Sequence, residues 1–359
     1  MSTSTSTGRR LVSSNGPRSN GSAPLIRAEG IWKIFGRNAD KVVGTPDADL
    51  PRSELRAKTG CVAAVRDVSF EVYPGEVFVV MGLSGSGKST LVRTLIRLIE
   101  PTAGRIELDG RDVTAASHDE LLQLRRHTSS MVFQHFGLLA HRTVLDNVAF
   151  GLEVQGVSKA QRHARASEIL KLVGLEDAAS QFPSELSGGM QQRVGLARAF
   201  AVDPKVLLYD EPFSALDPLI RRDMQDEVIR LQEETGKTTV FITHDLPEAL
   251  RLGDRIAIMR DGRIVQLGTP EELVGSPADE YVENFVRDIP RSHVLTLRWI
   301  MREARAGEED GPKLDVATTV RNAVSVIAAS ERPCCAVADG KIVGVVDKDA
   351  VLTAIAGEE

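Results

Sequence analysis

The sequence predicts an α/β protein built on a parallel sheet, because short apolar runs alternate along the chain with stretches of helical spacing. Parallel strands that are buried on both faces form such uninterrupted apolar runs. A helix between two runs supplies the crossover that parallel neighbours require. Leu91, Leu95 and Leu98 give one helical pattern, and Glu168–Val173 gives another. The predicted strands are Val77–Met81, Val206–Tyr209 and Val240–Thr243.

The chain divides into a tail and two predicted domains, of which the first is the larger. Residues 1–24 are mostly Ser, Thr, Gly, Asn and Pro, which predicts a disordered tail. They lack the apolar core of ~7–15 residues that a signal peptide needs. The first domain is expected over residues 25–285, with a helical subdomain at about 135–200. Its opening strands flank a polar insertion at 37–60, which we interpret as a loop.

A second, small α+β domain is expected over residues 291–359. A polar stretch with Pro290 and the run "REARAGEEDG" separates these last residues from the rest of the chain. They carry strand, helix and turn signals of their own.

Composition limits the possible functions. The 359 residues are 42% hydrophobic and 26% charged, which is ordinary for a globular protein. No uncharged apolar run approaches the ~18 residues that span a bilayer, so a membrane role would depend on a partner. The net charge of −6 argues against nucleic acid as a partner. The odd set Cys61, Cys334 and Cys335 lacks zinc-ligand spacing and fits a reducing cytoplasm.

The stretch "MGLSGSGKST" has the pattern of a phosphate-binding loop. It fits GxxxxGK[ST], follows an apolar strand and precedes a helical pattern, which is the context that this motif requires. Glycines permit positive φ, so that backbone N–H groups converge on phosphate oxygens at a helix N-terminus. Lys88 would contact the β and γ phosphates, and the Ser89 hydroxyl would bind Mg²⁺. The alternative is a Gly/Ser turn with a chance lysine. The candidate residues are Gly82, Ser84, Gly85, Ser86, Gly87, Lys88, Ser89 and Thr90.

Two later strand ends offer the remaining groups that hydrolysis of a triphosphate needs. In "KVLLYDEP", Asp210 would hold the metal, and Glu211 would orient or deprotonate the attacking water. His244, in "VFITHD", could stabilise charge at the γ phosphate. Gln134, in "MVFQHF", could contact metal or water. Alone, an Asp–Glu pair at a strand end is usually the solvated start of a loop, and the histidine could be a capping or core residue.

A second candidate anion site lies in "LSGGMQQR", Leu186–Arg193. Ser187 and the N–H groups of Gly188 and Gly189 precede a helical run and would form another anion-binding helix start. A flexible turn is the structural alternative, but it leaves the ordered succession of motifs unexplained.

These motifs together resemble the ATP-binding-cassette (ABC) family of transport ATPases over roughly residues 25–285. The resemblance implies a homodimer, packed head to tail, in which the Lys88 loop of one subunit and the 187–189 signature of the other enclose each ATP. It also implies that Glu211 is the general base and His244 the switch residue. Gln134 would lie in the loop that senses the membrane partner and would contribute to the metal site with Ser89 and Asp210.

Two further residues follow from the same resemblance. Asp217, in "SALD", matches the segment that communicates across the dimer. An aromatic ring from the first strands usually stacks on adenine, and "IWKIFG" offers Trp32 or Phe35, of which Phe35 is preferred. Either ring could instead pack in the sheet.

Within this family the chain resembles ATPase subunits of glycine betaine/proline betaine importers. The match is carried by the insertion ending "LRAKTG", and by "RLIEPTAG", "VFQHFGLLAHRTVLDNVAFG" and "FSALDPLIRRDMQDE". It implies a peripheral protein at the cytoplasmic face of the membrane, with a separate permease and, indirectly, an extracytoplasmic solute-binding protein. Other solutes, such as an amino acid or a polyamine, and a soluble regulatory ABC ATPase remain alternatives.

The C-terminal segment resembles one cystathionine-β-synthase (CBS) type repeat. The signals run strand, helix, strand, strand, helix through "TTVRNAVSVIAASERPCCAVADGKIVGVVDKDAVLTAIAG". A paired module would therefore need a second subunit. Nucleotide-binding repeats tend to place Ser or Thr three residues after the glycine of "GVV" and Asp six after it, whereas this chain has Asp347 and Ala350. Sensing of ionic strength, nucleotide binding and dimerisation alone all stay open.

Overall fold

The computed structural model describes residues 22–134, 137–214 and 216–356. The chain forms two compact units that divide between Leu267 and Gly268. The predicted tail at 1–24 lies almost wholly outside the described residues. No described helix has the length and apolar character needed to cross a membrane.

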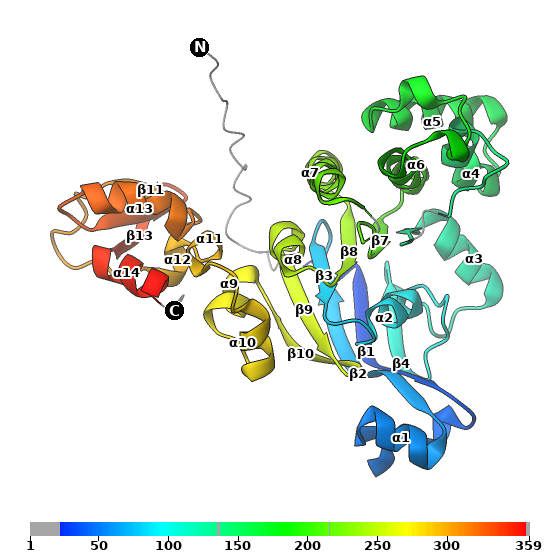
Figure 1. Ribbon diagram of the computed structural model, residues 1–359, viewed down its shortest axis with the longest axis horizontal. Coiled ribbons are helices and arrows are strands. Elements are labelled where there is room, and N and C mark those ends of the chain that lie inside the picture. The colour runs from blue at the N-terminus through cyan, green and yellow to red at the C-terminus, as the bar shows by residue number, and fades with distance from the viewer. Residues whose placement is uncertain (1–21, 135–136, 215, 357–359) are drawn as a thin grey trace. The chain divides into compact units, whose positions relative to one another are not determined.

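The first unit is organised around a six-stranded sheet of order β10-β9-β3-β8-β7-β6 (Figure 1). Strands β9, β3, β8, β7 and β6 pair in parallel, which confirms the predicted α/β class. Every residue of β3, β7 and β8 is buried, as their uninterrupted apolar sequences predicted. The strands are β3 Val77–Met81, β6 Ser129–Val132, β7 Val206–Asp210, β8 Thr238–Thr243, β9 Arg255–Arg260 and β10 Arg263–Gly268.

A second, antiparallel sheet of order β2-β1-β4-β5 packs against the first. Helix α2, Lys88–Leu95, shares one hydrophobic core with both sheets. At this junction the rings of Phe70 and Phe78 stack with centroids 4.9 Å apart. The packing fixes the start of α2 at the end of β3. The strands are β1 Ile26–Phe35, β2 Val62–Val72, β4 Ala103–Leu108 and β5 Arg111–Asp112.

The insertion between β1 and β2, residues 37–60, is folded and not the loop that its polar sequence predicted. It contains the short 3-10 helices η1, Ala39–Lys41, and η2, Pro46–Asp49, followed by helix α1, Arg52–Thr59, drawn in blue in Figure 1. The fully buried Leu55 anchors α1 in a small core that also contains Ile34 and Cys61. Val42, Ala48 and Leu55 of the insertion pack with a few apolar residues of the flanking strands, which suffices to order it.

Helices cover the rest of this unit. Helices α4, α5 and α6 pack together as a helical subdomain beyond the edge strand β6, shown in green in Figure 1. The helices are α3 His118–His127, α4 Val144–Val154, α5 Lys159–Leu172, α6 Gly188–Ala201, α7 Pro218–Thr235 and α8 Leu246–Leu252, with 3-10 turns η3 Glu176–Ala178 and η4 Pro183–Glu185.

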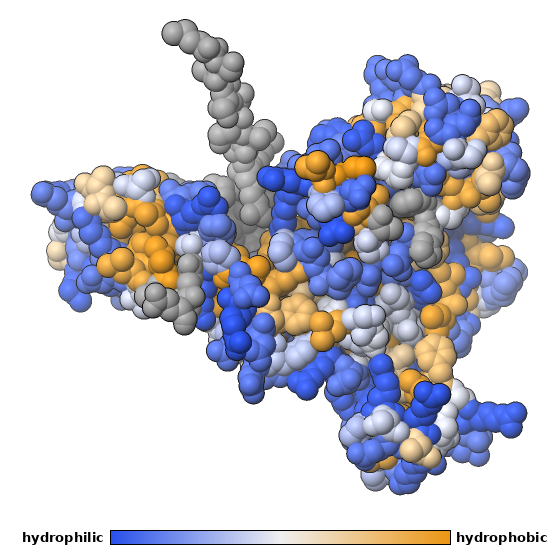
Figure 2. All heavy atoms as spheres, viewed as in Figure 1, coloured by the Kyte–Doolittle hydropathy of each residue, from blue (hydrophilic) through white to orange (hydrophobic). Residues whose placement is uncertain are grey.

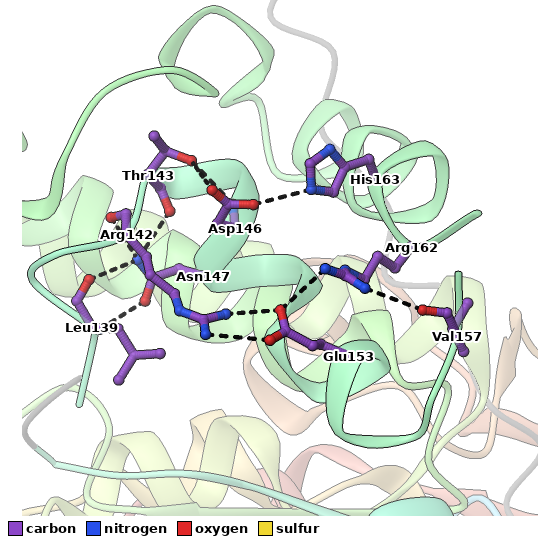
Figure 3. Close-up of polar contacts among 9 residues, drawn as sticks. All are labelled: Leu139, Arg142, Thr143, Asp146, Asn147, Glu153, Val157, Arg162 and His163. Atoms are coloured by element: carbon purple, nitrogen blue, oxygen red, sulfur yellow. Dashed lines mark hydrogen bonds and ion pairs between the residues drawn. The ribbon is translucent and has the colours of Figure 1, made fainter. Parts of the chain in front are cut away.

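A buried amide holds the loop that enters the helical subdomain. Asn147, which is 0% exposed, accepts a hydrogen bond from the Leu139 N–H and donates from Nδ2 to the carbonyls of Leu139, Arg142 and Thr143 (Figure 3). The Arg142 guanidinium forms a two-pronged pair with Glu153. One side chain thus contacts four backbone groups of this segment, and for the Leu139 and Thr143 carbonyls it adds to a backbone hydrogen bond.

The second unit is an α+β region, as predicted. Its sheet has the order β11-β12-β13, with a parallel first pair and an antiparallel second pair. Cys334 and Cys335 on β12 are buried free thiols. The elements are α9 Pro270–Gly275, α10 Glu280–Val286, α11 Arg291–Val294, α12 Leu297–Ile300, β11 Lys313–Asp315, α13 Val320–Ala329, β12 Cys334–Ala338, β13 Lys341–Val346 and α14 Lys348–Ala356.

The Asn147 contacts predict a strong effect of side-chain removal. Asn147→Ala should lower the free energy of unfolding by about 2–4 kcal/mol, because a buried side chain is removed and the Leu139 N–H and Arg142 carbonyl lose its hydrogen bonds. Urea unfolding of the purified chain measures this. Asp146→Ala is the matched control on the same turn of α4: its pair with His163, at 3.0 Å, is partly exposed, so the loss should stay below about 1 kcal/mol. Equal losses for the two variants would contradict the assignment.

Candidate functional site

The candidate site forms where three parallel strands end side by side. In the sheet, Met81 at the end of β3 lies opposite Thr243 at the end of β8. Asp210 at the end of β7 lies opposite Ile242 of the same neighbour. Because parallel strands end at one edge, the phosphate loop, the Asp210–Glu211 pair and His244 follow three adjacent strands.

The phosphate loop, residues 82–87, has a backbone that only glycine accommodates at its two ends. Gly82 has φ 148°, and an added Cβ would lie 2.3 Å from the Met259 carbonyl oxygen. Gly87 has φ 109°, and an added Cβ would lie 2.0 Å from the Ala64 carbonyl oxygen. At both ends the loop therefore packs closely against the backbone of neighbouring segments, at Met259 and at Ala64, which a phosphate-binding loop can do only with glycine.

The remaining loop residues lead into helix α2. Ser84 and Gly85 are exposed, whereas Ser86 is buried, and its Oγ has no hydrogen-bond partner among the described residues. Ser89 and Thr90 follow Lys88 in the first turn of α2 and are half-buried. A glycine-rich loop that leads into a helix N-terminus, with a buried hydroxyl that has no partner among the described residues, fits an anionic ligand.

Lys88 is buried and points back over the loop. Its Nζ donates to the carbonyl oxygens of Gly82 at 2.8 Å and Leu83 at 3.2 Å, and it lies 3.4 Å from the Glu211 carboxylate. Burial lowers the pKa of the Lys88 ammonium, and the neighbouring Glu211 carboxylate opposes that shift. A buried cation held between loop and carboxylate is placed to attract a phosphate.

Glu211 connects the phosphate loop to His244. Its carboxylate contacts Lys88 Nζ and lies 3.1 Å from His244 Nδ1, while its backbone has φ 46°. A left-handed conformation is unfavourable for a non-glycine residue and is found preferentially at functional sites. The Glu211 side chain is 19% exposed and that of His244 is 53% exposed, so both groups can reach a ligand from solvent.

Asp210 is buried and paired with a residue that the sequence analysis missed. Arg93, on α2, bonds Asp210 Oδ2 through Nε at 3.0 Å and through Nη2 at 2.9 Å. These two bonds fix the carboxylate and leave Oδ1 free of this pair. The Ser89 hydroxyl lies on the same helix as Arg93. The Asp210 carboxylate and this hydroxyl offer oxygen ligands of the kind that Mg²⁺ prefers.

Three other predicted residues lie on or after strands outside this central group. Gln134 is exposed two residues beyond the edge strand β6. Phe35, at the end of β1, is 45% exposed, and Lys33 Nζ lies 4.8 Å from its ring centroid. Trp32 instead packs against the core of the insertion, and the Arg263 guanidinium lies 5.9 Å from its ring. The exposed Phe35 ring is the one that is free to stack on a base.

The predicted signature lies apart from the phosphate loop. Ser187 caps α6 by accepting a hydrogen bond from the Met190 N–H at 3.3 Å, and Gly188 beside it is exposed. Gly189 is buried: an added Cβ would lie 2.8 Å from Ile220. Asp217 is exposed at the N-cap of α7, where its side chain makes no capping bond. The structure thus does not bring the two cradles together within one chain.

Gln192 joins the signature helix to the strand ends and was also missed from the sequence. This fully buried amide donates from Nε2 to the Pro212 carbonyl oxygen at 2.5 Å. It ties the helical subdomain to the residue that follows Glu211. Its place in "MQQR" gave no signal, because one glutamine of a pair is indistinguishable by type from the other.

The loop geometry predicts a position-specific cost of adding one methyl group. Gly87→Ala should destabilise the chain by more than about 3 kcal/mol and abolish ATP binding, since backbone must move. The control is Gly110→Ala, with φ 70° and nothing within 4 Å of the added Cβ, which should cost only about 1 kcal/mol. Urea unfolding and equilibrium ATP binding measure the two effects. Similar losses would show that φ alone, and not the contact with Ala64, fixes this glycine.

Comparison with known sequences identifies related proteins. The ABC transporter family model matches residues 65–214. The glycine betaine transport ATP-binding protein of Bacillus subtilis is 54% identical over 308 residues, which cover 86% of this chain and 74% of that protein. The trimethylamine N-oxide transport system ATP-binding protein of Ruegeria pomeroyi is 48% identical over 331 residues, covering 92% and 96%.

A solved structure shares the fold. It is an ATP-binding cassette, described as a dimer in a post-hydrolysis state bound to ADP and Pi, and it is 32% identical to this chain. The alignment covers 68% of this chain and 98% of that one, with a TM-score of 0.58. The resemblance inferred from the motifs is thereby confirmed. This chain belongs to the ABC transporter family, as one of its ATP-binding proteins, and is an ABC-type ATPase.

Proposed function

We propose that this chain is the ATP-hydrolysing subunit of an importer for a quaternary-amine osmoprotectant of the glycine betaine or proline betaine type. The observation that carries the catalytic part is the convergence of Lys88, Glu211 and His244 at one sheet edge. The substrate class is supported by the name of the B. subtilis relative, which covers most of this chain.

Each group at the edge has a role that its position supports. The N–H groups of residues 82–90 and the Lys88 ammonium bind and orient the β and γ phosphates. Glu211 takes a proton from the attacking water, or aligns it, and His244 donates to the γ phosphate. Phe35 stacks on the adenine. The pairing of Glu211 with both Lys88 and His244 keeps all three within reach of one phosphate.

Ser89 and Asp210 are the residues that would hold Mg²⁺, with Gln134 approaching from its exposed loop. The ion supplies charge neutralisation at the phosphate oxygens when it is bound. The described residues contain no group of three or more His, Cys, Asp or Glu side chains placed for a metal ion. A site of one carboxylate, one hydroxyl and phosphate oxygens is what Mg²⁺, which keeps several of its waters, commonly uses.

The two separated cradles support a head-to-tail homodimer. Ser187 and Gly188 are exposed at the start of α6, so they are available to a second copy. The dimeric cassette among the related structures supports this arrangement for a protein of the same fold. Asp217, exposed at the N-cap of α7, would communicate across that interface.

The membrane partner would be a separate permease, with an extracytoplasmic solute-binding protein acting through it. A transporter ATPase at the cytoplasmic face must pass the effect of nucleotide binding to such a permease, and closure on ATP gives a population shift that can do so. Gln134 is exposed between the sheet and the helical subdomain, where it would sense that contact.

Trimethylamine N-oxide is a second candidate solute. The R. pomeroyi relative with that name matches over 96% of its own length, whereas the glycine betaine relative matches over 74%. Glycine betaine and the N-oxide both carry a methylated, positively charged nitrogen near a negatively charged oxygen. The full-length match is what favours the second candidate.

Uptake by whole cells separates the two solutes and tests the catalytic assignment. Cells lacking this gene should lose uptake of labelled glycine betaine, and wild type should restore it whereas Glu211→Gln should not. The purified variant should still bind ATP but hydrolyse it at least 100-fold more slowly, because it has lost its base. Restoration of N-oxide uptake alone would replace the substrate proposal. Near-normal hydrolysis by Glu211→Gln would remove that residue as the base.

The second unit is proposed to be a single CBS-like module, over residues 291–359, that pairs with that of another subunit. Figure 2 shows hydrophobic residues gathered on its visible face, and Trp299, Val343 and Leu352 are its exposed large apolar side chains. Asp347 accepts a hydrogen bond from the Ala350 N–H at 2.9 Å and lies 3.1 Å from Arg302. The position six residues after Gly344 is Ala350, which has no carboxylate, and this favours pairing over binding of ribose.

Pairing of the module predicts a concentration-dependent mass. Sedimentation of the full chain without ATP should show dimers, and Leu352→Glu should weaken their association at least tenfold, because a charge would be buried in the interface. Lys348→Glu, on the same helix, offers a surface control. A monomeric wild-type chain at high concentration would rule out the pairing.

A further inference from the structure

The ATPase roles assigned above leave the insertion at residues 37–60 without a part. It is firmly attached to the sheets: Arg66, which is buried, donates from Nη1 to the carbonyl oxygens of Ala48 at 3.1 Å and Leu50 at 2.8 Å. Asp49 pairs with Arg263 of β10. With Leu55 fully buried, these contacts hold α1 in a fixed position.

The first residue of α1 reaches the phosphate loop. Arg52 donates from Nη1 to the Gly85 carbonyl oxygen at 2.9 Å and from Nη2 to the Ala63 carbonyl oxygen at 3.4 Å. Gly85 lies within the loop and has φ 80°, while Ala63 lies on β2. One guanidinium therefore joins the phosphate loop to a strand of the antiparallel sheet.

This bond holds one end of a loop peptide group whose other end is held within the loop itself. The Gly85 carbonyl and the Ser86 N–H belong to one rigid peptide unit. A donor outside the loop holds the carbonyl outward, and the Ser86 N–H bonds the Leu83 carbonyl at 3.1 Å on the other side. A loop that binds phosphate through its N–H groups needs its carbonyls turned away, and reversal at a glycine costs little unless something opposes it.

We propose that Arg52 is a positioning residue for the phosphate loop, and that the folded insertion serves to carry it there. Its cationic guanidinium also adds positive charge beside the loop, which favours an approaching triphosphate. The inference rests on the proposed role of residues 82–90 in binding phosphate. It assigns the insertion to nucleotide affinity and not to the solute or the permease.

Equilibrium binding and steady-state hydrolysis of MgATP by the full chain test this assignment. Arg52→Ala should raise both the Kd and the KM for ATP about five- to tenfold with kcat within twofold of wild type, since loop orientation affects binding most. Arg52→Lys should give a smaller rise, because an ammonium keeps the charge but lacks the fork that spans two carbonyls.

Lys58→Ala is the matched control. Lys58 lies on α1 and pairs with Asp47 at 2.6 Å inside the insertion, without contact to the loop. It should leave Kd and KM unchanged. Equal increases in Lys58→Ala and Arg52→Ala would overturn the assignment by showing a general loosening of the insertion, and so would an unchanged Kd in Arg52→Ala. If Arg52→Ala does not fold, the Kd of Arg52→Lys decides in the same way.

Lys88→Ala separates this inference from the function on which it rests. If Lys88→Ala loses ATP affinity and Arg52→Ala keeps it, only the role of Arg52 is wrong. If Lys88→Ala binds ATP as wild type does, the phosphate loop itself has been misassigned, and the proposal for Arg52 is overturned with it.

Discussion

The parallel register of β3, β8 and β7 is the constraint on which the rest of this structure depends. Pairing of Met81 with Thr243, and of Asp210 with Ile242, brings three strand ends to one edge. These strands are wholly buried, so their register is fixed by packing on both faces. The segments that follow them therefore meet at this edge, where Glu211 contacts both Lys88 and His244.

Electrostatics then organises the groups that the sheet brings together. Lys88 is buried at a helix N-terminus, where burial works against its charge and Glu211 works for it. Glu211 also contacts His244, while Arg93 of α2 pairs with Asp210. Each acidic group at the site thus has a basic neighbour. The basic groups are already in place, so a phosphate can bind without a change of fold.

Hydrogen bonds from side chains to the backbone hold the irregular segments around this centre in place. Asn147 binds four backbone groups of the loop that leads into the helical subdomain. Gln192 bonds Pro212 beside Glu211, and Arg52 bonds Gly85 within the phosphate loop. In each case a side chain from a rigid helix fixes a carbonyl in a loop. Buried amides and guanidinium groups suit this task because they offer several donors in a fixed plane.

The sequence by itself determined the α/β class, the α+β character of the last region, the phosphate-loop motif and the family. Those features are encoded locally, in hydrophobic period and in glycine spacing. The tertiary structure decided the rest: that residues 37–60 fold around Leu55, and that Arg93 meets Asp210 across 117 positions of sequence. Arg52 reaches Gly85 across 33 positions. The buried apolar residues of the insertion, Val42, Ala48 and Leu55, follow no helical or strand period, and an arginine on a helix carries no mark of its distant partner. Such contacts arise only when the chain packs.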